Sequence, residues 1–233
     1  KSPQFIENDR LQTFDVVLAN PPYSISQWDR ESWSSDRWGR NKFGTPPQGR
    51  ADYAFFQHIV ESMHAKSGRC AILFPHGVLF RKEEYSMRKA MIEADVVDVV
   101  IGLGPNLFYN APMESCIVIC RSKKPAKHKK SVLFIDGLNE VTRERTFSFL
   151  SEQNQKNICD AFFADEDVES FSRRVSLSEI EENQFDLTVH RYVERKSGVV
   201  GVEFAEALSG FQQAHKDLNS AMKKMESIVK AGL

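Results

Sequence analysis

The chain has 233 residues, of which 41% are hydrophobic and 27% charged, a globular composition long enough to build a sizeable core. Its formal net charge of -1 argues against a strongly basic nucleic-acid-binding protein. No apolar run reaches the roughly 20 residues of a membrane span. The four cysteines lack CxxC spacing, and the histidines show no metal-ligand spacing. The sequence therefore predicts a reduced, cytoplasmic protein with no metal and no membrane contact.

Short apolar runs alternate with helical patterns in the first half of the chain. The predicted strands are 14–19, 70–74, 96–101 and 114–120, and the predicted helices are 52–66 and 83–94. Residues 14–19 are expected to form a buried parallel strand, and Asp52 is expected to cap the first helix. Residues 24–50 have no period and are predicted to form a long loop. The alternation favours a parallel, α/β layered sheet.

A basic turn at 121–130 precedes another predicted strand at 132–135. Together, residues 114–135 are expected to form a terminal hairpin at the sheet edge. Ser151 is the predicted N-cap of a helix that runs through Phe162. Residues 178–181 match the spacing of a capping box.

The last 30 residues carry a heptad pattern. Its seam positions step by four and three residues: Phe204, Leu208, Phe211, His215, Leu218, Met222, Met225 and Val229. Only His215 interrupts the apolar seam. The pattern predicts a helix that docks against another chain, and residues 196–199 form a linker able to release it. The alternative is a long amphipathic helix that packs on its own domain.

Asn20-Pro21-Pro22-Tyr23 directly follows the first predicted strand, where ligands bind in open α/β sheets. An exocyclic aromatic amine is a poor nucleophile because its lone pair is delocalised into the ring. Acceptors at the Asn20 side chain and the Pro21 carbonyl would bind its two N–H groups and expose the lone pair, and Tyr23 offers a face for a planar base. The alternative is ordinary turn chemistry, for which Asn-Pro and Pro-Pro are common signals.

Residues 14–23 (FDVVLANPPY) resemble the catalytic motif of amino-methyltransferases that use S-adenosylmethionine. Further segments follow at matching distances: 51–58 (ADYAFFQH), 74–81 (FPHGVLFR), 101–109 (IGLGPNLFY) and 132–136 (VLFID). Together they resemble the modification (M) subunit of type I restriction–modification systems, which methylates adenine in DNA. The resemblance ends at residues 183–193 (NQFDLTVHRYV). The tetrapeptide alone also occurs in enzymes that methylate RNA bases or protein glutamine.

The resemblance implies a partial Rossmann-like methyltransferase sheet, followed by a helical carboxyl-terminal region. It places Asn20, Pro21, Pro22 and Tyr23 at the target amine of an adenine flipped out of double-stranded DNA. Either Phe108 or Tyr109 would stack on the other face of that base, with core packing as the alternative for Phe108. Asn20 and Phe55 would contact S-adenosylmethionine, although Phe55 also suits the buried face of its helix. The implied partners are a specificity (S) and a restriction (R) subunit.

All three tryptophans lie in the predicted loop beside arginines. The candidate DNA contacts are Trp28, Arg30, Trp33, Arg37, Trp38 and Arg40. Exposed aromatic rings interleaved with arginines suit phosphates and unstacked bases. The alternative is that the tryptophans pin the loop onto the protein body.

Two features of the family are missing from this sequence. No Gly-x-Gly turn opens a helix near the start, and no acidic residue follows a second strand to grip the ribose of the cofactor. We therefore expect the carboxyl-terminal portion of a larger M subunit, inactive alone, whose truncated sheet edge favours self-association. The expected division is 1–136 for the catalytic part, 137–195 for a mixed helical extension, and 196–233 for the docking helix.

Two alternatives remain open. The first is a solo amino-methyltransferase that acts on RNA or protein glutamine, although such an enzyme needs no docking helix. The second is a non-catalytic assembly module, against which the intact Asn20-Pro21-Pro22-Tyr23 segment argues.

Overall fold

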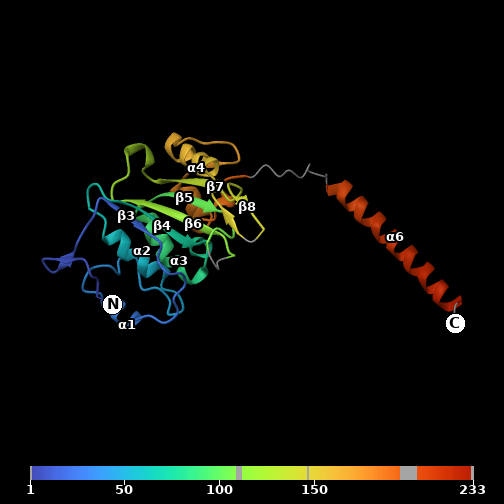
Figure 1. The fold of residues 1–233 in the computed structure, drawn as a ribbon, viewed down its shortest axis with the longest axis horizontal. Helices are drawn as coiled ribbons and strands as arrows, with labels where there is room; N and C mark the ends of the chain where they lie inside the picture. Colours follow the sequence, from blue (N-terminus) through green and yellow to red (C-terminus); the bar gives the residue numbers. More distant parts are fainter. Residues whose placement is uncertain (1, 109–111, 146, 195–203, 232–233) are drawn as a thin grey trace. The chain divides into compact units, whose positions relative to one another are not determined.

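The computed structural model describes residues 2–231 except 109–111, 146 and 195–203. It divides into two compact units, residues 1–195 and 196–233. Figure 1 shows their elements. The strands are β1 (Ile6–Glu7), β2 (Arg10–Leu11), β3 (Val16–Ala19), β4 (Arg69–Pro75), β5 (Val97–Leu103), β6 (Ser115–Arg121), β7 (Ser131–Gly137), β8 (Thr142–Arg143), β9 (Ser148–Phe149) and β10 (Ser172–Ser176). The α-helices are α1 (Arg30–Ser34), α2 (Asp52–Glu61), α3 (Tyr85–Glu93), α4 (Glu152–Ala164), α5 (Leu177–Glu182) and α6 (Phe204–Ala231). The 3-10 segments are η1 (His76–Leu79), η2 (Lys82–Glu84), η3 (Ala126–His128) and η4 (Val189–Arg191).

A six-stranded mixed sheet organises the first unit, in the order β10-β7-β5-β6-β4-β3. Strands β3, β4, β5 and β7 run in one direction, whereas β6 and β10 run against their neighbours. The α/β class is confirmed, but the purely parallel arrangement is wrong. The predicted terminal hairpin is also wrong, because β6 lies between β5 and β4 while β7 pairs with β5 on its other side.

Two apolar clusters cover the two faces of the sheet. On one face, helices α2, α3 and α5 pack against alternate residues of the strands, with Ile72, Val100 and Phe134 at the centre. On the other face, α4 contributes Ile158 and Ala161, which pack against strands β5 and β7. The sheet is therefore fully layered on its first face. Among the described residues of this unit, its second face is covered mainly beside α4.

Strand β3 is an edge strand, and the prediction that it is buried is wrong. Val17 and Ala19 pack against the first apolar cluster. Val16 and Leu18 point to the opposite face, where they are 46% and 78% exposed. A continuous apolar run is typical of a strand covered on both faces, but here the described residues cover only one.

The observed helix N-caps agree with the predicted N-caps only in part. Ser151 caps α4 and forms a capping box with Asn154, as expected for that N-cap. Ser178 does not cap α5, because Ser176 accepts the hydrogen bond from the Glu179 backbone N–H. Asp52 does not cap α2 either; it is the first helical residue, and its carboxylate binds Ser24 and Arg81 instead.

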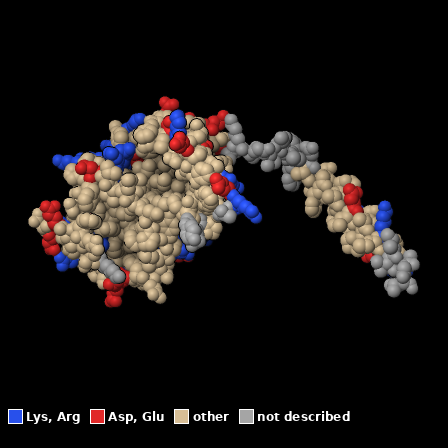
Figure 2. All heavy atoms as spheres, in the orientation of Figure 1, with Lys and Arg blue, Asp and Glu red and all other residues tan. Residues whose placement is uncertain are grey.

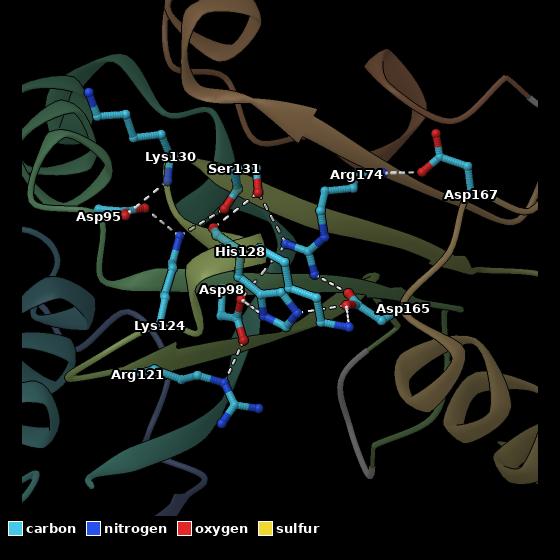
Figure 3. A network of polar contacts seen from close by, with 11 residues as sticks. Asp95, Asp98, Arg121, Lys124, His128, Lys130, Ser131, Asp165, Asp167 and Arg174 are labelled. Carbon is cyan, nitrogen blue, oxygen red and sulfur yellow. Dashed lines mark hydrogen bonds and ion pairs between the residues drawn. The ribbon is translucent and has the colours of Figure 1, made fainter. Parts of the chain in front are cut away.

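A polar network fastens α4 and β10 to the start of β5 (Figure 3). His128 lies between two carboxylates, with Nδ1 3.0 Å from Asp98 and Nε2 2.6 Å from Asp165. Arg174 of β10 also binds Asp165. Arg121 binds Asp98 from the end of β6. This network lies at the opposite end of the parallel strands from residue 20.

The second unit contains α6, 28 residues long, in agreement with the predicted helix. Its described seam residues are exposed: Leu208, Phe211, His215, Leu218, Met222 and Met225. The side chains of Phe204 and Val229 and the linker at 196–199 lie outside the described residues. No helix in the described part of the chain is long and apolar enough to cross a bilayer.

Candidate active site

The carboxyl ends of β3, β4 and β5 meet at one edge of the sheet, because these strands share a direction. The start of the antiparallel strand β6, at Ser115, lies at the same edge. Residues 20–23 therefore extend from β3 beside the segment that follows β4. Open α/β sheets bind their ligands at this edge.

The Asn-Pro-Pro-Tyr segment combines fixed and open side chains. Pro21 is buried, Asn20 and Pro22 are exposed, and Tyr23 is half-buried. The two prolines have no backbone N–H, so the β3 ladder ends at Ala19. Burial raises the pKa of Tyr23, a shift that the adjacent Ser115 hydroxyl partly offsets. The segment thus presents an amide and part of an aromatic ring to the surface from a rigid backbone.

Ser24, the residue after this segment, is held from the side by a buried carboxylate. Its backbone N–H donates to Oδ1 of Asp52 over 2.7 Å, and the Ala51 N–H donates to the Ile25 carbonyl. Asp52 is 1% exposed, and its Oδ2 lies 2.8 Å from the Arg81 guanidinium. Sequence reasoning assigned no site role to these residues. The segments 51–58 and 74–81, which match the family at fixed distances, contained the signal.

A second buried acid lies behind this pair. Glu84 is fully buried, its Oε2 is 3.5 Å from Arg81, and its Oε1 has no hydrogen-bond partner among the described residues. Burial raises the pKa of Glu84 to about 7, because the lowering effect of Arg81 offsets only part of the desolvation. Arg88 lies nearby and donates to the carbonyls of Phe185 and Arg81. The site therefore rests on a layer of buried ionisable side chains.

The aromatic candidates have different positions. Phe55 is half-buried on α2, whereas its neighbour Phe56 belongs to the core of that helix. Phe108 is also half-buried, after the end of β5. Both rings therefore keep surface that a ligand can contact. Tyr109 lies outside the described residues.

The loop of residues 24–50 is tied down by its own side chains. Trp33 and Arg40 are each 7% exposed; the Arg40 guanidinium lies over the Trp33 ring and binds Asp36. Trp28 donates to the Gln48 carbonyl over 3.0 Å. Trp33 and Arg40 therefore pin the loop and leave little surface for a nucleic acid.

The remaining candidates on this loop are more open. Arg37 and Trp38 form a cation–π pair at 4.3 Å, and Arg37 also pairs with Asp9. Arg30 is exposed, and its Nε donates to the Pro46 carbonyl over 2.8 Å. On the face shown in Figure 2, basic and acidic side chains are mixed around the rim of the first unit. No continuous basic stripe crosses the described residues of that face.

Asn20 and Phe55 are the two candidate contacts to S-adenosylmethionine, and both keep exposed surface. An amide and an aromatic ring suit the polar and the planar parts of such a cofactor, as the family resemblance implies. No Gly-x-Gly turn opens a helix near the start of these 233 residues, and Gly102-Leu103-Gly104 precedes Pro105 and no helix. Among the described residues, no group of three or more His, Cys, Asp or Glu side chains could hold a metal ion.

Comparisons with known proteins agree with this geometry. A model of the N-6 DNA methylase family matches residues 1–198. The chain is 35% identical over 184 residues to the type I restriction enzyme MpnII methylase subunit of Mycoplasma pneumoniae, covering 77% of this chain and 33% of that subunit. It is 31% identical over 244 residues to the HindI methylase subunit of Haemophilus influenzae, covering 99% and 52%.

A solved structure is similar as well. The type I restriction-modification methyltransferase subunit of Streptococcus thermophilus matches with a TM-score of 0.73 and 34% identity, over 79% of this chain and 39% of that one. The chain thus spans between a third and about half of the length of these relatives. Since the family model matches most of the sequence and this subunit shares its fold, the chain belongs to the N-6 DNA methylase family.

Proposed function

We propose that this chain supplies the target-base side of an adenine-N6 DNA methyltransferase in a type I restriction–modification complex. The observation that carries the proposal is the Asn-Pro-Pro-Tyr segment at the carboxyl edge of the parallel strands. There Pro21 is buried, while Asn20 is exposed and Tyr23 half-buried. Family membership supports the same reading.

In this proposal the protein prepares the amine by hydrogen bonding. The Asn20 side-chain oxygen and the Pro21 carbonyl accept the two N–H groups of the adenine N6 amine, which exposes its lone pair. S-adenosylmethionine, when bound, supplies the electrophilic methyl group. Tyr23 stacks on one face of the flipped base, and Phe108 or Tyr109 on the other. No general base is required before transfer, because the amine loses its proton after it is methylated.

DNA contacts are assigned to the open side chains of the loop. Arg30, Arg37 and Trp38 are the remaining candidates for phosphate and base contacts. Trp28 is half-buried and stays a candidate as well. Trp33 and Arg40 support the loop from inside. This division favours a protein that relies on a specificity subunit for most of its grip on DNA.

The exposed seam of α6 is proposed to dock on another subunit, and a specificity subunit is the favoured partner. Phe211 is 70% exposed and Met225 is 64% exposed, although both belong to an apolar heptad seam. A solved type I restriction–modification assembly at 18% identity shares the fold of this chain. The restriction subunit is the further partner of the complex in this proposal.

The experiment replaces Asn20 in the assembled methyltransferase that carries this sequence. Asn20→Ala is expected to abolish methyl transfer to adenine in cognate DNA, because one of the two acceptors is lost. Assembly and DNA binding should remain as in wild type. Tritium incorporation from labelled S-adenosylmethionine measures the reaction. Retained methylation by Asn20→Ala would remove this residue from its role.

A further inference from the structure

We infer that Asp52 and Arg81 form a clamp that positions the Asn-Pro-Pro-Tyr segment by holding Ser24 in a left-handed conformation. The inference rests on the proposed function of that segment. It assigns Asp52 and Arg81 a positioning role and no contact with substrate. Asp52 and Arg81 lie outside the Asn-Pro-Pro-Tyr segment, so the residue types and the exposure of that segment do not point to them.

Ser24 provides the first observation. Its φ is 50°, in the left-handed region that non-glycine residues adopt only at an energetic cost. Such a conformation persists where the surroundings hold it. Here the Ser24 N–H donates to Asp52 Oδ1 over 2.7 Å, and the Ser24 hydroxyl donates to Oδ2 over 3.3 Å. Two hydrogen bonds that Ser24 donates to one carboxylate therefore fix the residue next to Tyr23.

The carboxylate is itself fixed in place. Asp52 is 1% exposed and lies in the first turn of α2, where the helix dipole favours a negative charge. Arg81 binds it over 2.8 Å, and the Arg81 side chain is 14% exposed. A hydrogen-bonded ion pair with little solvent access has few alternative geometries, so Ser24 is held at a defined position.

Gly77 makes room for the guanidinium. A Cβ atom built at this glycine would lie 2.5 Å from Arg81 Nε and 2.7 Å from Nη2. Any side chain at position 77 would therefore displace Arg81. The segments 51–58 and 74–81, far apart in the sequence, meet at this point behind the catalytic segment.

The clamp also reaches the target-base side electrostatically. Burial is the largest cause of the raised pKa of Tyr23, and Cys116 and then Asp52 add smaller electrostatic contributions. The Asp52 carboxylate therefore interacts electrostatically with the Tyr23 phenol. Helix α2 carries Asp52 in its first turn and Phe55 three residues later. One rigid helix thus positions the Tyr23 side of the base pocket and the proposed contact to the cofactor.

The test uses the assembled methyltransferase with Asp52→Ala, Asp52→Asn and Gly77→Ala. A displacement of about 1 Å at a reacting group costs on the order of 100-fold in rate. We therefore expect Asp52→Ala to lower kcat about 100-fold, with the Kd for cognate DNA within about 2-fold of wild type. Asp52→Asn keeps an acceptor for the Ser24 N–H and should recover much of the rate. Gly77→Ala removes no charge and should lower kcat like Asp52→Ala, because it moves Arg81.

Two readouts need no methyl donor. Fluorescence of 2-aminopurine at the target position reports capture of the flipped base, and the signal should fall in Asp52→Ala but not in Asp52→Asn. Hydrogen exchange at the Ser24 amide should be faster in Asp52→Ala. Glu61→Ala is the matched control, since it removes a carboxylate from the other end of α2, and it should match wild type.

The outcomes separate the two hypotheses. If wild type does not methylate adenine, the proposed function fails. If wild type is active, Asn20→Ala is inactive, and the folded Asp52→Ala and Gly77→Ala proteins both keep the wild-type kcat and 2-aminopurine signal, the clamp is wrong. If Asp52→Ala does not fold, Gly77→Ala with unchanged thermal stability and reduced kcat supports the clamp.

Discussion

The imidazole of His128 joins Asp98 to Asp165, two carboxylates that lie 67 positions apart in the sequence. Asp98 belongs to the central strand β5, and Asp165 ends helix α4. Both ring nitrogens face carboxylate oxygens, at 3.0 Å from Asp98 and 2.6 Å from Asp165. Because Arg174 binds Asp165 from β10, this contact links the helix, the edge strand and the sheet centre (Figure 3).

The acid side of this network gives a stability prediction. Burial alone raises the pKa of Asp165, but hydrogen bonds from Lys127, Arg174 and His128 outweigh it and hold the pKa well below its usual range. A lowered pKa in the folded state stabilises the protein above the unfolded value of about 4, and this contribution is lost as the pH falls further. Asp165→Asn should lower the free energy of unfolding by about 2 kcal/mol at pH 7.

Urea denaturation at pH 7 and at pH 3 measures this effect. The difference between wild type and Asp165→Asn should shrink at pH 3. The control is Asp160→Asn, whose exposed pair with Lys156 should contribute less than about 0.5 kcal/mol. Equal effects of the two substitutions would contradict the prediction.

Glu84 gives a prediction of opposite sign. Its pKa is raised to about 7, so the neutral carboxyl is favoured in the folded protein. The protonated Glu84 carboxyl makes its full contribution to the free energy of unfolding below about pH 4.5. This contribution is lost as the pH rises through 7. Glu84→Gln removes the titration and should gain stability relative to wild type by about 2 kcal/mol between pH 5 and pH 8.

Thermal or urea unfolding at several pH values tests the Glu84 prediction. The ratio of the two unfolding constants should change between about pH 4.5 and pH 7 and level off above pH 7. Glu83→Gln, at an exposed position next along the chain, is the control and should show no such curve. A pH-independent difference for Glu84→Gln would refute the assignment.

The sequence predicted local features better than the order of the strands. Apolar runs placed β4 and β5 within two residues, because such runs depend on neighbouring positions. Strand β10 was missed because Ser172-Arg-Arg-Val-Ser176 is polar, and only Ser172 and Val175 are buried. The predicted position of β6 in the sheet was wrong because the local residue pattern predicts a strand but not the strands with which it pairs.

The candidate site shows the same limit. The Asn-Pro-Pro-Tyr segment can be predicted as a site from its own residue types and from its position after a strand. The residues next to Asp52 predict a helix cap at that position, and the structure shows a different role. The contacts of Asp52 to Ser24 and Arg81 span 28 and 29 positions, and they exist only after the sheet has formed. The sequence predicts Trp33 and Arg40 as DNA contacts together with their exposed neighbours, because residue type alone does not distinguish a buried side chain from an exposed one.

Strand β3 predicts self-association of the 233-residue chain when it is expressed alone. Leu18 is 78% exposed at an unpaired sheet edge, and fully burying a leucine side chain is worth about 2 kcal/mol. Sedimentation velocity should show a concentration-dependent dimer that Leu18→Lys weakens. Phe163→Lys, equally exposed on α4, should leave the dimer unchanged. A monomer at every concentration would refute this prediction.

The seam of α6 predicts loss of assembly on local substitution. Phe211→Asp or Met222→Asp places a charge on the apolar seam and should abolish co-purification with the specificity subunit. Ser220→Asp, on the opposite face of the helix by its spacing, should leave it intact. Circular dichroism should show similar helix content in all three proteins. Assembly that survives both seam substitutions would remove α6 from the interface.

The open second face of the sheet has a thermodynamic consequence. Leu133 and Ile135 of β7 are fully buried on this face, while Leu18 of β3 remains largely hydrated. Unfolding therefore hydrates less new apolar surface than in a fully layered domain. We expect a heat capacity of unfolding below the usual ~12–15 cal/mol/K per residue and a flatter dependence of stability on temperature. Whatever covers β3 should bind with a negative heat capacity change, which calorimetry records directly.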